Sequence, residues 1–322
     1  MNEATLERHA RHLVLPQLGE VGVSAIASGR VLVAGLGGLG SAVTYYLATA
    51  GVGTLYLADF DKVSLSNLQR QILYTMNDID RLKTRQATAV VRKLNPEIIT
   101  IPLAVKLNAA TVPDLTRNVD IVVDCLDALG DKIMLHDAVL RAGKWFVHGS
   151  ALGMTGQVTT IIPSKSTCLR CFFDTIDSDE RRSCAAHGVF APLCGMIGSF
   201  LASEVLKALL ILRRVPSTIP TDSNSKDSSP PKSNFTHSSP PKSNFKDSSP
   251  KDSNLKNATS TAALFPHDNN PNTLHTNTSL LTNQLLTLDA AKNRFHILKR
   301  SPFCSFCKTL APSNVPPIPA IN

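Results

Sequence analysis

The stretch VLVAGLGGLGS (residues 31–41) is an apolar run that breaks into glycines and then enters a helical pattern. Gly35, Gly37, Gly38 and Gly40 let the backbone approach a phosphate closely, and the following helix presents its N-terminal N–H groups to that phosphate. The same loop serves NAD, FAD and ATP alike. It therefore predicts a nucleotide site and leaves the nucleotide open.

Apolar strand patterns alternate with helical patterns through much of the chain. The expected strands cover residues 30–35, 54–61, 98–105, 119–127 and 144–152. The expected helices cover residues 41–52, 81–96, 131–143 and 195–212. This alternation predicts an α/β fold, a Rossmann-like sheet of mainly parallel strands flanked by helices. The last helix is apolar enough for burial against the sheet.

Residues 216–276 differ in composition from the rest of the chain, because Ser, Asn, Pro and Lys dominate and SSPPKSNF occurs twice. Such a segment buries too little apolar surface to offset its ordering entropy, so it predicts a disordered insert. Residues 283–300 return to a strand–turn–strand pattern. We therefore expect one domain made of residues 1–215 and 277–310, with a flexible tail at 311–322.

The composition of this 322-residue chain narrows the kinds of partner to expect. Its formal net charge is +8, but the Lys and Arg residues are scattered and aromatic residues make up only 5%, which argues against nucleic-acid binding. The N-terminus lacks an apolar signal region, and polar residues or glycines interrupt each apolar run before the roughly 20 residues needed to span a bilayer. We expect a cytoplasmic protein without a membrane partner and without structural disulfides.

Polar residues beyond the glycine loop narrow the choice of nucleotide. In chain order they are Asp59, Asn67, Arg70, Gln71, Lys83 and Asp127. Asp59 closes the second strand, where an acid accepts a hydrogen bond from a ribose hydroxyl. Added cations suit an enzyme that breaks a phosphoanhydride, because charge develops on the leaving pyrophosphate. Asp127 ends another strand and can hold Mg²⁺. The set favours nucleotidyl transfer over an NAD- or FAD-linked oxidoreductase.

Four stretches resemble the ThiF/MoeB/HesA family, bacterial relatives of the ubiquitin-activating enzymes: VLVAGLGGLGS, YLADFDKVSLSNLQRQ, DCLD and GVFAPLCGMIGS. The resemblance runs from about Arg8 to Lys308 without the insert, and SNLQRQ (residues 66–71) is highly specific. It implies ATP-dependent adenylation of the C-terminal glycine of a small ubiquitin-like sulfur-carrier protein, MoaD-like or ThiS-like, in molybdopterin or thiamine biosynthesis. Pyrophosphate leaves with Mg²⁺, and an acyl-adenylate remains for thiolation.

The resemblance also implies roles for single residues. Asp59 is expected to hold the ribose and Asp127 the Mg²⁺ ion. The residues expected on the triphosphate are Asn67, Arg70 and Lys83. Arg11 matches an arginine that reaches into the ATP site of a second subunit, which implies a homodimer. Gln71 shares the motif and is expected near the nucleotide. The expected catalytic residues are Arg70, Lys83, Asp127 and Arg11.

The chain departs from the family pattern at several positions. The usual DCTDN reads DCLDA here, with Leu126 and Ala128, and His9 and His12 replace a tyrosine and a glutamine of RYxRQ. Asp127 is kept, so metal binding is still expected, while the lost polar groups are expected to retune contacts with ATP or the carrier. These departures keep open a non-catalytic scaffold that binds nucleotide or carrier.

Two CxxC pairs have the spacing of a four-thiolate zinc site, Cys168 with Cys171 and Cys304 with Cys307. The resemblance implies the same site. Zinc bound there would tie the C-terminal antiparallel hairpin to the middle of the chain and add folding free energy. The expected cofactors are therefore ATP, Mg²⁺ and Zn²⁺.

Cys184 is the cysteine with a candidate chemical role. Its neighbours Arg181 and Arg182 favour a thiolate, and ThiF-like members use a cysteine at the matching place for sulfur transfer, whereas MoeB-like members do not need it. No rhodanese-like extension follows, so we expect a separate protein as persulfide donor. The residues expected only to pack or to satisfy a polar partner are Cys125, Cys194, His148 and His187.

Overall fold

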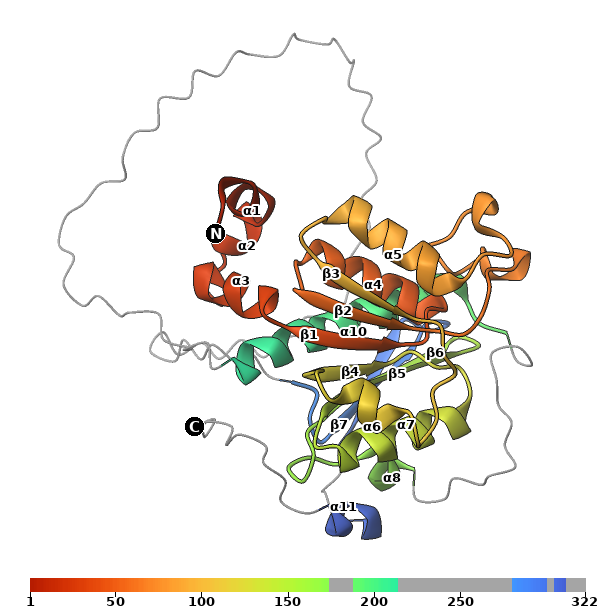
Figure 1. Ribbon diagram of the computed structural model, residues 1–322. Helices are drawn as coiled ribbons and strands as arrows, with labels where there is room; N and C mark the ends of the chain where they lie inside the picture. Colours follow the sequence, from red (N-terminus) through yellow and green to blue (C-terminus); the bar gives the residue numbers. More distant parts are fainter. Residues whose placement is uncertain (174–187, 214–279, 300–303, 311–322) are drawn as a thin grey trace, which may run out of the picture. The chain divides into compact units, whose positions relative to one another are not determined.

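The computed structural model describes four stretches of the chain, residues 1–173, 188–213, 280–299 and 304–310 (Figure 1). They belong to one unit assembled from Met1–Ser217 and Thr278–Asn322. The predictions for the insert, the tail, Cys184 and His187 lie outside the described residues.

One sheet of eight strands, in the order β3-β2-β1-β4-β5-β6-β7-β8, organises the described residues. The strands are β1 (Arg30–Ala34), β2 (Thr54–Ala58), β3 (Ile99–Leu103), β4 (Ile121–Asp124), β5 (Trp145–Leu152), β6 (Thr155–Ile161), β7 (Gln284–Asp289) and β8 (Arg294–Lys299). Pairing is parallel from β3 to β5 and antiparallel from β5 to β8. The predicted mainly parallel sheet with a C-terminal antiparallel hairpin is confirmed.

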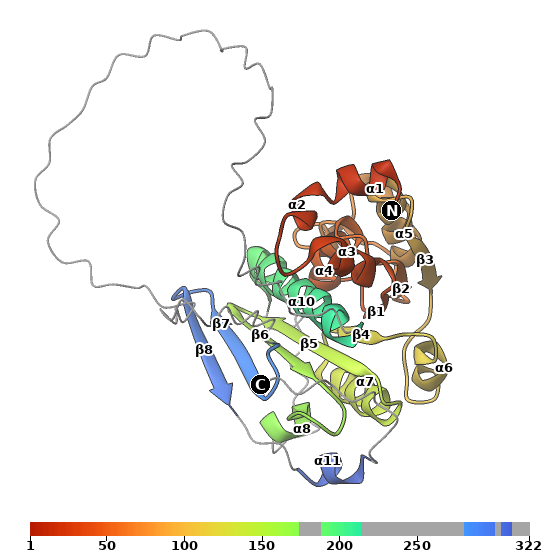
Figure 2. The same cartoon turned by 90° about the vertical axis from the view of Figure 1, so that its left-hand side faces the viewer.

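Helices cover both faces of this sheet (Figures 1 and 2). They are α1 (Glu3–Arg8), α2 (Ala10–Leu13), α3 (Gly19–Ala27), α4 (Gly38–Thr49), α5 (Lys83–Leu94), α6 (Val112–Thr116), α7 (Leu129–Arg141), α8 (Leu169–Phe172), α10 (Ala191–Leu212) and α11 (Ser305–Thr309), with 3₁₀ turns η1 (Leu65–Asn67) and η2 (Met76–Asp78).

Strand alternation divides the core into two clusters. Successive side chains of a strand point to opposite faces, so β1 sends Val31 and Val33 into a cluster with α3, α4, α5 and α10. Its Leu32 joins a second cluster with α6, α7 and α8. Both sets of side chains are fully buried, which is why β1 reads as a continuous apolar run.

Helix α10 packs against α4, β5 and β6, as its apolar sequence predicts. By length and composition it is also the one helix of the described residues that meets the criterion for a membrane span. That differs from our expectation that no apolar run is long enough. Half of the qualifying window is buried inside the protein, and core helices of globular domains meet the same criterion, so the grounds for a membrane span are weak.

The contact between α10 and α4 depends on a glycine. A Cβ added at Gly198 would lie 2.6 Å from the Cβ of Ala42 and 3.0 Å from the backbone oxygen of Leu39, whereas a Cβ added at Gly195 of the same helix meets nothing within 4 Å. We expect Gly198→Ala to lower the free energy of unfolding by about 1–3 kcal/mol through overpacking. Gly195→Ala is the matched control and should be neutral or stabilising by up to about 1 kcal/mol. Denaturant unfolding measures both, and equal stabilities would contradict this packing.

Candidate nucleotide site and cysteine cluster

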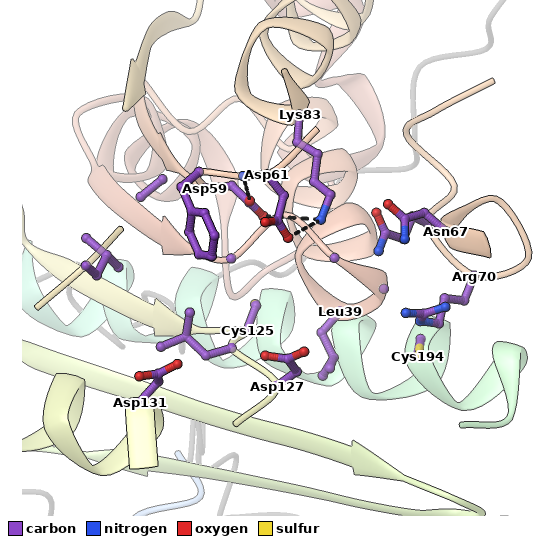
Figure 3. A pocket seen from close by; sticks show the side chains of 18 of the residues that line it. Leu39, Asp59, Asp61, Asn67, Arg70, Lys83, Cys125, Asp127, Asp131 and Cys194 are labelled. Carbon is purple, nitrogen blue, oxygen red and sulfur yellow. Dashed lines mark hydrogen bonds and ion pairs between the residues drawn. The ribbon is translucent and has the colours of Figure 1, made fainter. Parts of the chain in front are cut away.

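A pocket of about 310 Å³ lies where β1, β2 and β4 end (Figure 3). Strand β1 lies between β2 and β4 in the sheet, because the chain runs outward from β1 through β2 to β3 and then crosses back to β4 on the other side of β1. Such a switch point at the carboxyl edge of a parallel sheet is where open α/β folds bind ligands. The pocket brings together nine of the predicted site residues: Gly35, Gly37, Gly38, Asp59, Asn67, Arg70, Gln71, Lys83 and Asp127.

The glycine loop runs from β1 into the N-terminus of α4. Gly35 has a φ of +91°, a conformation that favours glycine. Gly37 caps α4 and no side chain caps the helix, so the first turn of a 12-residue helix presents N–H groups that suit an anion. Gly40 does not line the pocket, because it lies inside α4, where an added Cβ would be 1.9 Å from the backbone oxygen of Gly35.

Asp59 and Lys83 share a partly buried ion-pair network. The Oδ2 atom of Asp59 accepts a hydrogen bond from the N–H of Leu36, and its Oδ1 atom accepts one from the N–H of Asp61, both at 2.8 Å. Burial raises the pKa of Asp59, and the charge of Lys83 offsets this only in part. The Lys83 ammonium lies 2.9 Å from Oδ2 of Asp61 and 4.0 Å from Oδ2 of Asp59. Asp61 is a pocket residue that the sequence reasoning missed.

Asn67, Arg70 and Gln71 are held by the turn around η1. The Asn67 side chain accepts a hydrogen bond from the N–H of Ser64 and completes a capping box, while Arg70 donates to the carbonyl of Ser66. Gln71 is only 3% exposed, and its Oε1 atom has no hydrogen-bond partner. An added Cβ on Gly37 would lie 3.7 Å from the Gln71 amide nitrogen, so this amide lies beside the glycine loop.

Two carboxylates line another wall of the pocket. Asp127 follows β4 and is exposed, and Asp131 lies in the first turn of α7. Figure 3 shows both below Asp59 and Asp61, with Lys83 above these and Arg70 to the right. Carboxylate oxygens beside an expected phosphate site suit Mg²⁺. The sequence reasoning identified Asp127 but missed Asp131. Cys125 and Cys194, expected only to pack, are buried and also line this pocket.

Arg11 does not line the pocket of its own chain. It is exposed on α2. Next to it, the ring of His9 is buried and stacks on that of His12 at 5.8 Å between centroids. The two histidines that depart from the family pattern therefore pack against each other on either side of Arg11 in the sequence.

The two CxxC pairs meet in space. The sulfur atoms of the four cysteines all lie within 4.8 Å of one another. Three pairs are 3.6–3.8 Å apart, namely Cys168–Cys171, Cys168–Cys304 and Cys171–Cys307. Four thiolates placed tetrahedrally about 2.3 Å from a zinc ion are about 3.8 Å apart. The cluster therefore fits the predicted four-thiolate site, which joins α8 to α11.

The cysteine cluster is also clamped to α7. The Phe306 ring lies beneath two guanidinium groups, those of Arg141 at 5.2 Å and Arg170 at 5.6 Å. His136 accepts a hydrogen bond from the N–H of Leu169 and stacks at a tilt on Phe306. These contacts connect α8 and α11 to the helix whose first turn carries Asp131.

The comparison with known sequences agrees with the site. The ThiF family profile matches residues 9–256. The chain belongs to the ThiF family. It is 36% identical over 210 residues to the sulfur carrier protein ThiS adenylyltransferase of Escherichia coli (strain K12), covering 65% of this chain and 83% of that relative. The molybdopterin-synthase adenylyltransferase of the same organism is 37% identical over 210 residues, with 65% and 84% covered.

Longer relatives match over part of their length. The adenylyltransferase and sulfurtransferase MOCS3 of Bos taurus is 40% identical over 208 residues, which are 64% of this chain but 46% of that protein. The chain thus spans about half of such relatives. Among solved structures, Escherichia coli MccB with ATP shares the fold at a TM-score of 0.65 and 19% identity, over 95% of this chain and 74% of that one.

The cysteine cluster makes a testable prediction about metal content. We expect the purified chain to contain about one zinc ion, and Cys304→Ser to lose it and to melt at a lower temperature, because bound zinc contributes folding free energy. Elemental analysis and thermal unfolding measure the two effects. Cys184→Ser is the control and should keep both zinc and stability. Zinc retained in Cys304→Ser would contradict the four-thiolate site.

Proposed function

We propose that this protein is an ATP-dependent adenylyltransferase that activates the C-terminal glycine of a small ubiquitin-like sulfur-carrier protein. One observation carries the proposal: the glycine loop, the cations Arg70 and Lys83, and the carboxylate of Asp127 all line one pocket at the strand ends. A redox site for NAD needs the glycine loop and a ribose-binding acid, but not these added cations and the further carboxylate. The activities for which the two Escherichia coli relatives are named support this choice.

In this proposal the glycine loop and the N-terminus of α4 bind the phosphates. Asp59 is fixed by two backbone N–H groups, and each carboxylate oxygen keeps a lone pair for a ribose hydroxyl. Lys83 is already buried beside Asp59 and paired with Asp61, so a phosphate competes with Asp61 for its ammonium. Arg70 and Asn67 extend the cationic and polar wall toward the triphosphate.

The reaction needs charge stabilisation more than proton transfer. A carboxylate oxygen of the carrier's terminal glycine attacks the α-phosphorus, the bond from that phosphorus to the bridging oxygen breaks, and pyrophosphate leaves. The attacking group is already ionised at neutral pH, so no general base is required. Arg70 and Lys83 stabilise the charge that moves onto pyrophosphate. Asp127, with Asp131 beside it, would hold a Mg²⁺ ion that neutralises the phosphate oxygens.

The remaining assignments belong to the same proposal. Arg11 is exposed on α2, which leaves it available to the ATP site of a second protomer in a homodimer. Cys184 is the candidate sulfur-transfer thiol, and a separate protein supplies the persulfide. The adenylyltransferase domain comprises residues 1–215 and 277–310, and the protein acts in the cytoplasm without nucleic acid or membrane.

Exchange of labelled pyrophosphate into ATP tests the function. We expect exchange that depends on Mg²⁺ and on one carrier ending in Gly-Gly, and a loss of at least about 100-fold in Asp127→Ala because transition-state charge stabilisation is removed. Cys184→Ala should keep exchange, since thiol chemistry follows adenylation. Asp289→Asn, at the end of β7 and outside the pocket, is the control. No exchange with MoaD-like or ThiS-like carriers would favour the non-catalytic scaffold, and full exchange in Asp127→Ala would contradict the metal role.

A further inference from the structure

A buried charged cluster lies behind the Asp127 wall of the pocket. Its members are Asp124 at the end of β4, Lys132 in α7 and His148 in β5, which are 0%, 4% and 2% exposed. Asp124 and His148 are direct neighbours in the parallel pairing of β4 with β5. None of the three lines the pocket, and the proposed chemistry does not use them.

Hydrogen bonds surround the Asp124 carboxylate. The Lys132 ammonium lies 3.3 Å from each of its oxygens and also donates to the carbonyl of Gly149 at 2.6 Å. The Nδ1 atom of His148 lies 2.7 Å from Oδ2. The Oδ1 atom of Asp124 also accepts a hydrogen bond from the N–H of Leu126 at 3.1 Å. Side chains from two other elements, α7 and β5, and one loop N–H therefore converge on a single carboxylate.

The cluster is electrically balanced. Burial lowers the pKa of His148 despite its hydrogen bond to Asp124, so the imidazole is neutral and its Nδ1–H donates. Burial alone would raise the pKa of Asp124, but the charge of Lys132 and the bond from His148 outweigh it and lower that pKa. One negative and one positive charge remain. Buried ion pairs contribute little net stability compared with apolar packing, which favours a positional role for this one.

The cluster acts on the backbone that carries Asp127. The bond from Leu126 N–H to the Asp124 side chain closes an Asx-type turn, two residues apart. On its other side the same turn touches the glycine loop, since a Cβ added at Gly35 would lie 2.9 Å from the carbonyl oxygen of Cys125. The turn at residues 125–127 is thus held between the glycine loop and Asp124.

We propose that Asp124, Lys132 and His148 are positioning residues that fix the turn at residues 125–127 and so direct the Asp127 carboxylate into the pocket. The inference rests on the proposed function, because it gives Asp127 its role with Mg²⁺ and ATP. Partners that orient a metal-binding carboxylate typically change metal affinity or activity by 10–100-fold when they are removed.

Paired substitutions at Lys132 test the network. Lys132→Met removes the charge and the donors at similar length, and we expect it to raise the Mg²⁺ concentration for half-maximal pyrophosphate exchange about tenfold while KM for the carrier stays unchanged. It should also speed hydrogen exchange at the Leu126 amide, read by mass spectrometry without any turnover. Lys132→Arg keeps charge and donors and should restore most of both properties.

A second pair covers the case in which Lys132→Met does not fold. His148→Leu leaves the ion pair intact and removes only the donor, whereas His148→Asn places an amide nitrogen where Nδ1 lies. We expect His148→Leu to raise the Mg²⁺ requirement and to speed hydrogen exchange at Leu126. We expect His148→Asn to restore both. Glu204→Gln is the matched control, because Glu204 is another carboxylate only 2% exposed that accepts the N–H of Leu281 at 2.8 Å and does not line the pocket. We expect Glu204→Gln to lower the melting temperature without changing the Mg²⁺ dependence or the hydrogen exchange at Leu126.

One result would overturn the positioning role, and a different result would overturn the proposed function. Folded Lys132→Met and His148→Leu variants with wild-type Mg²⁺ dependence and wild-type protection at Leu126 would overturn the positioning role. A wild-type protein without exchange for any carrier would overturn the proposed function instead. In that case the hydrogen-exchange comparison still decides whether the network holds the turn.

Discussion

The pocket depends on how closely three backbone segments approach one another at the end of β1. The glycine loop, the first turns of α4 and the turn after β4 leave no room for side chains between them, because added Cβ atoms at Gly35 and Gly40 would lie 2.9 Å and 1.9 Å from carbonyl oxygens. That approach brings Asp127 on one segment into the same pocket as the glycine loop on another. The close packing of these backbone segments therefore decides which charged side chains meet in the pocket.

Behind this contact, one group of side-chain contacts holds each end of α7. The Asp124–Lys132–His148 cluster connects the first turns of the helix to β4 and β5, and the Phe306 contacts connect its C-terminal half to the cysteine cluster. A single helix thus spans from the proposed zinc site to the wall of the nucleotide pocket. We infer that the proposed zinc site supports the pocket through α7, as well as joining α8 to α11.

Much of this architecture could be predicted from the sequence because its signals are local. Apolar runs and glycines located β1 through β5, and the CxxC spacing located the four cysteines that meet in space. The sequence reasoning missed β6, because its pattern TGQVTTI mixes polar and apolar residues, and it missed α1 to α3. It also missed Asp61 and Asp131, whose roles depend on side-chain geometry across different elements. The cluster around Asp124 depends on strand order, which periodicity alone does not reveal.

The central claim is that the glycine loop is the floor of an ATP site rather than a redox-cofactor site. Isothermal titration of the purified protein with a non-hydrolysable ATP analogue and Mg²⁺, and separately with NAD, tests it most directly. The account predicts saturable binding of the analogue that weakens in both Lys83→Met and Asp127→Asn, and no binding of NAD. Binding of NAD together with no binding of the ATP analogue would contradict it.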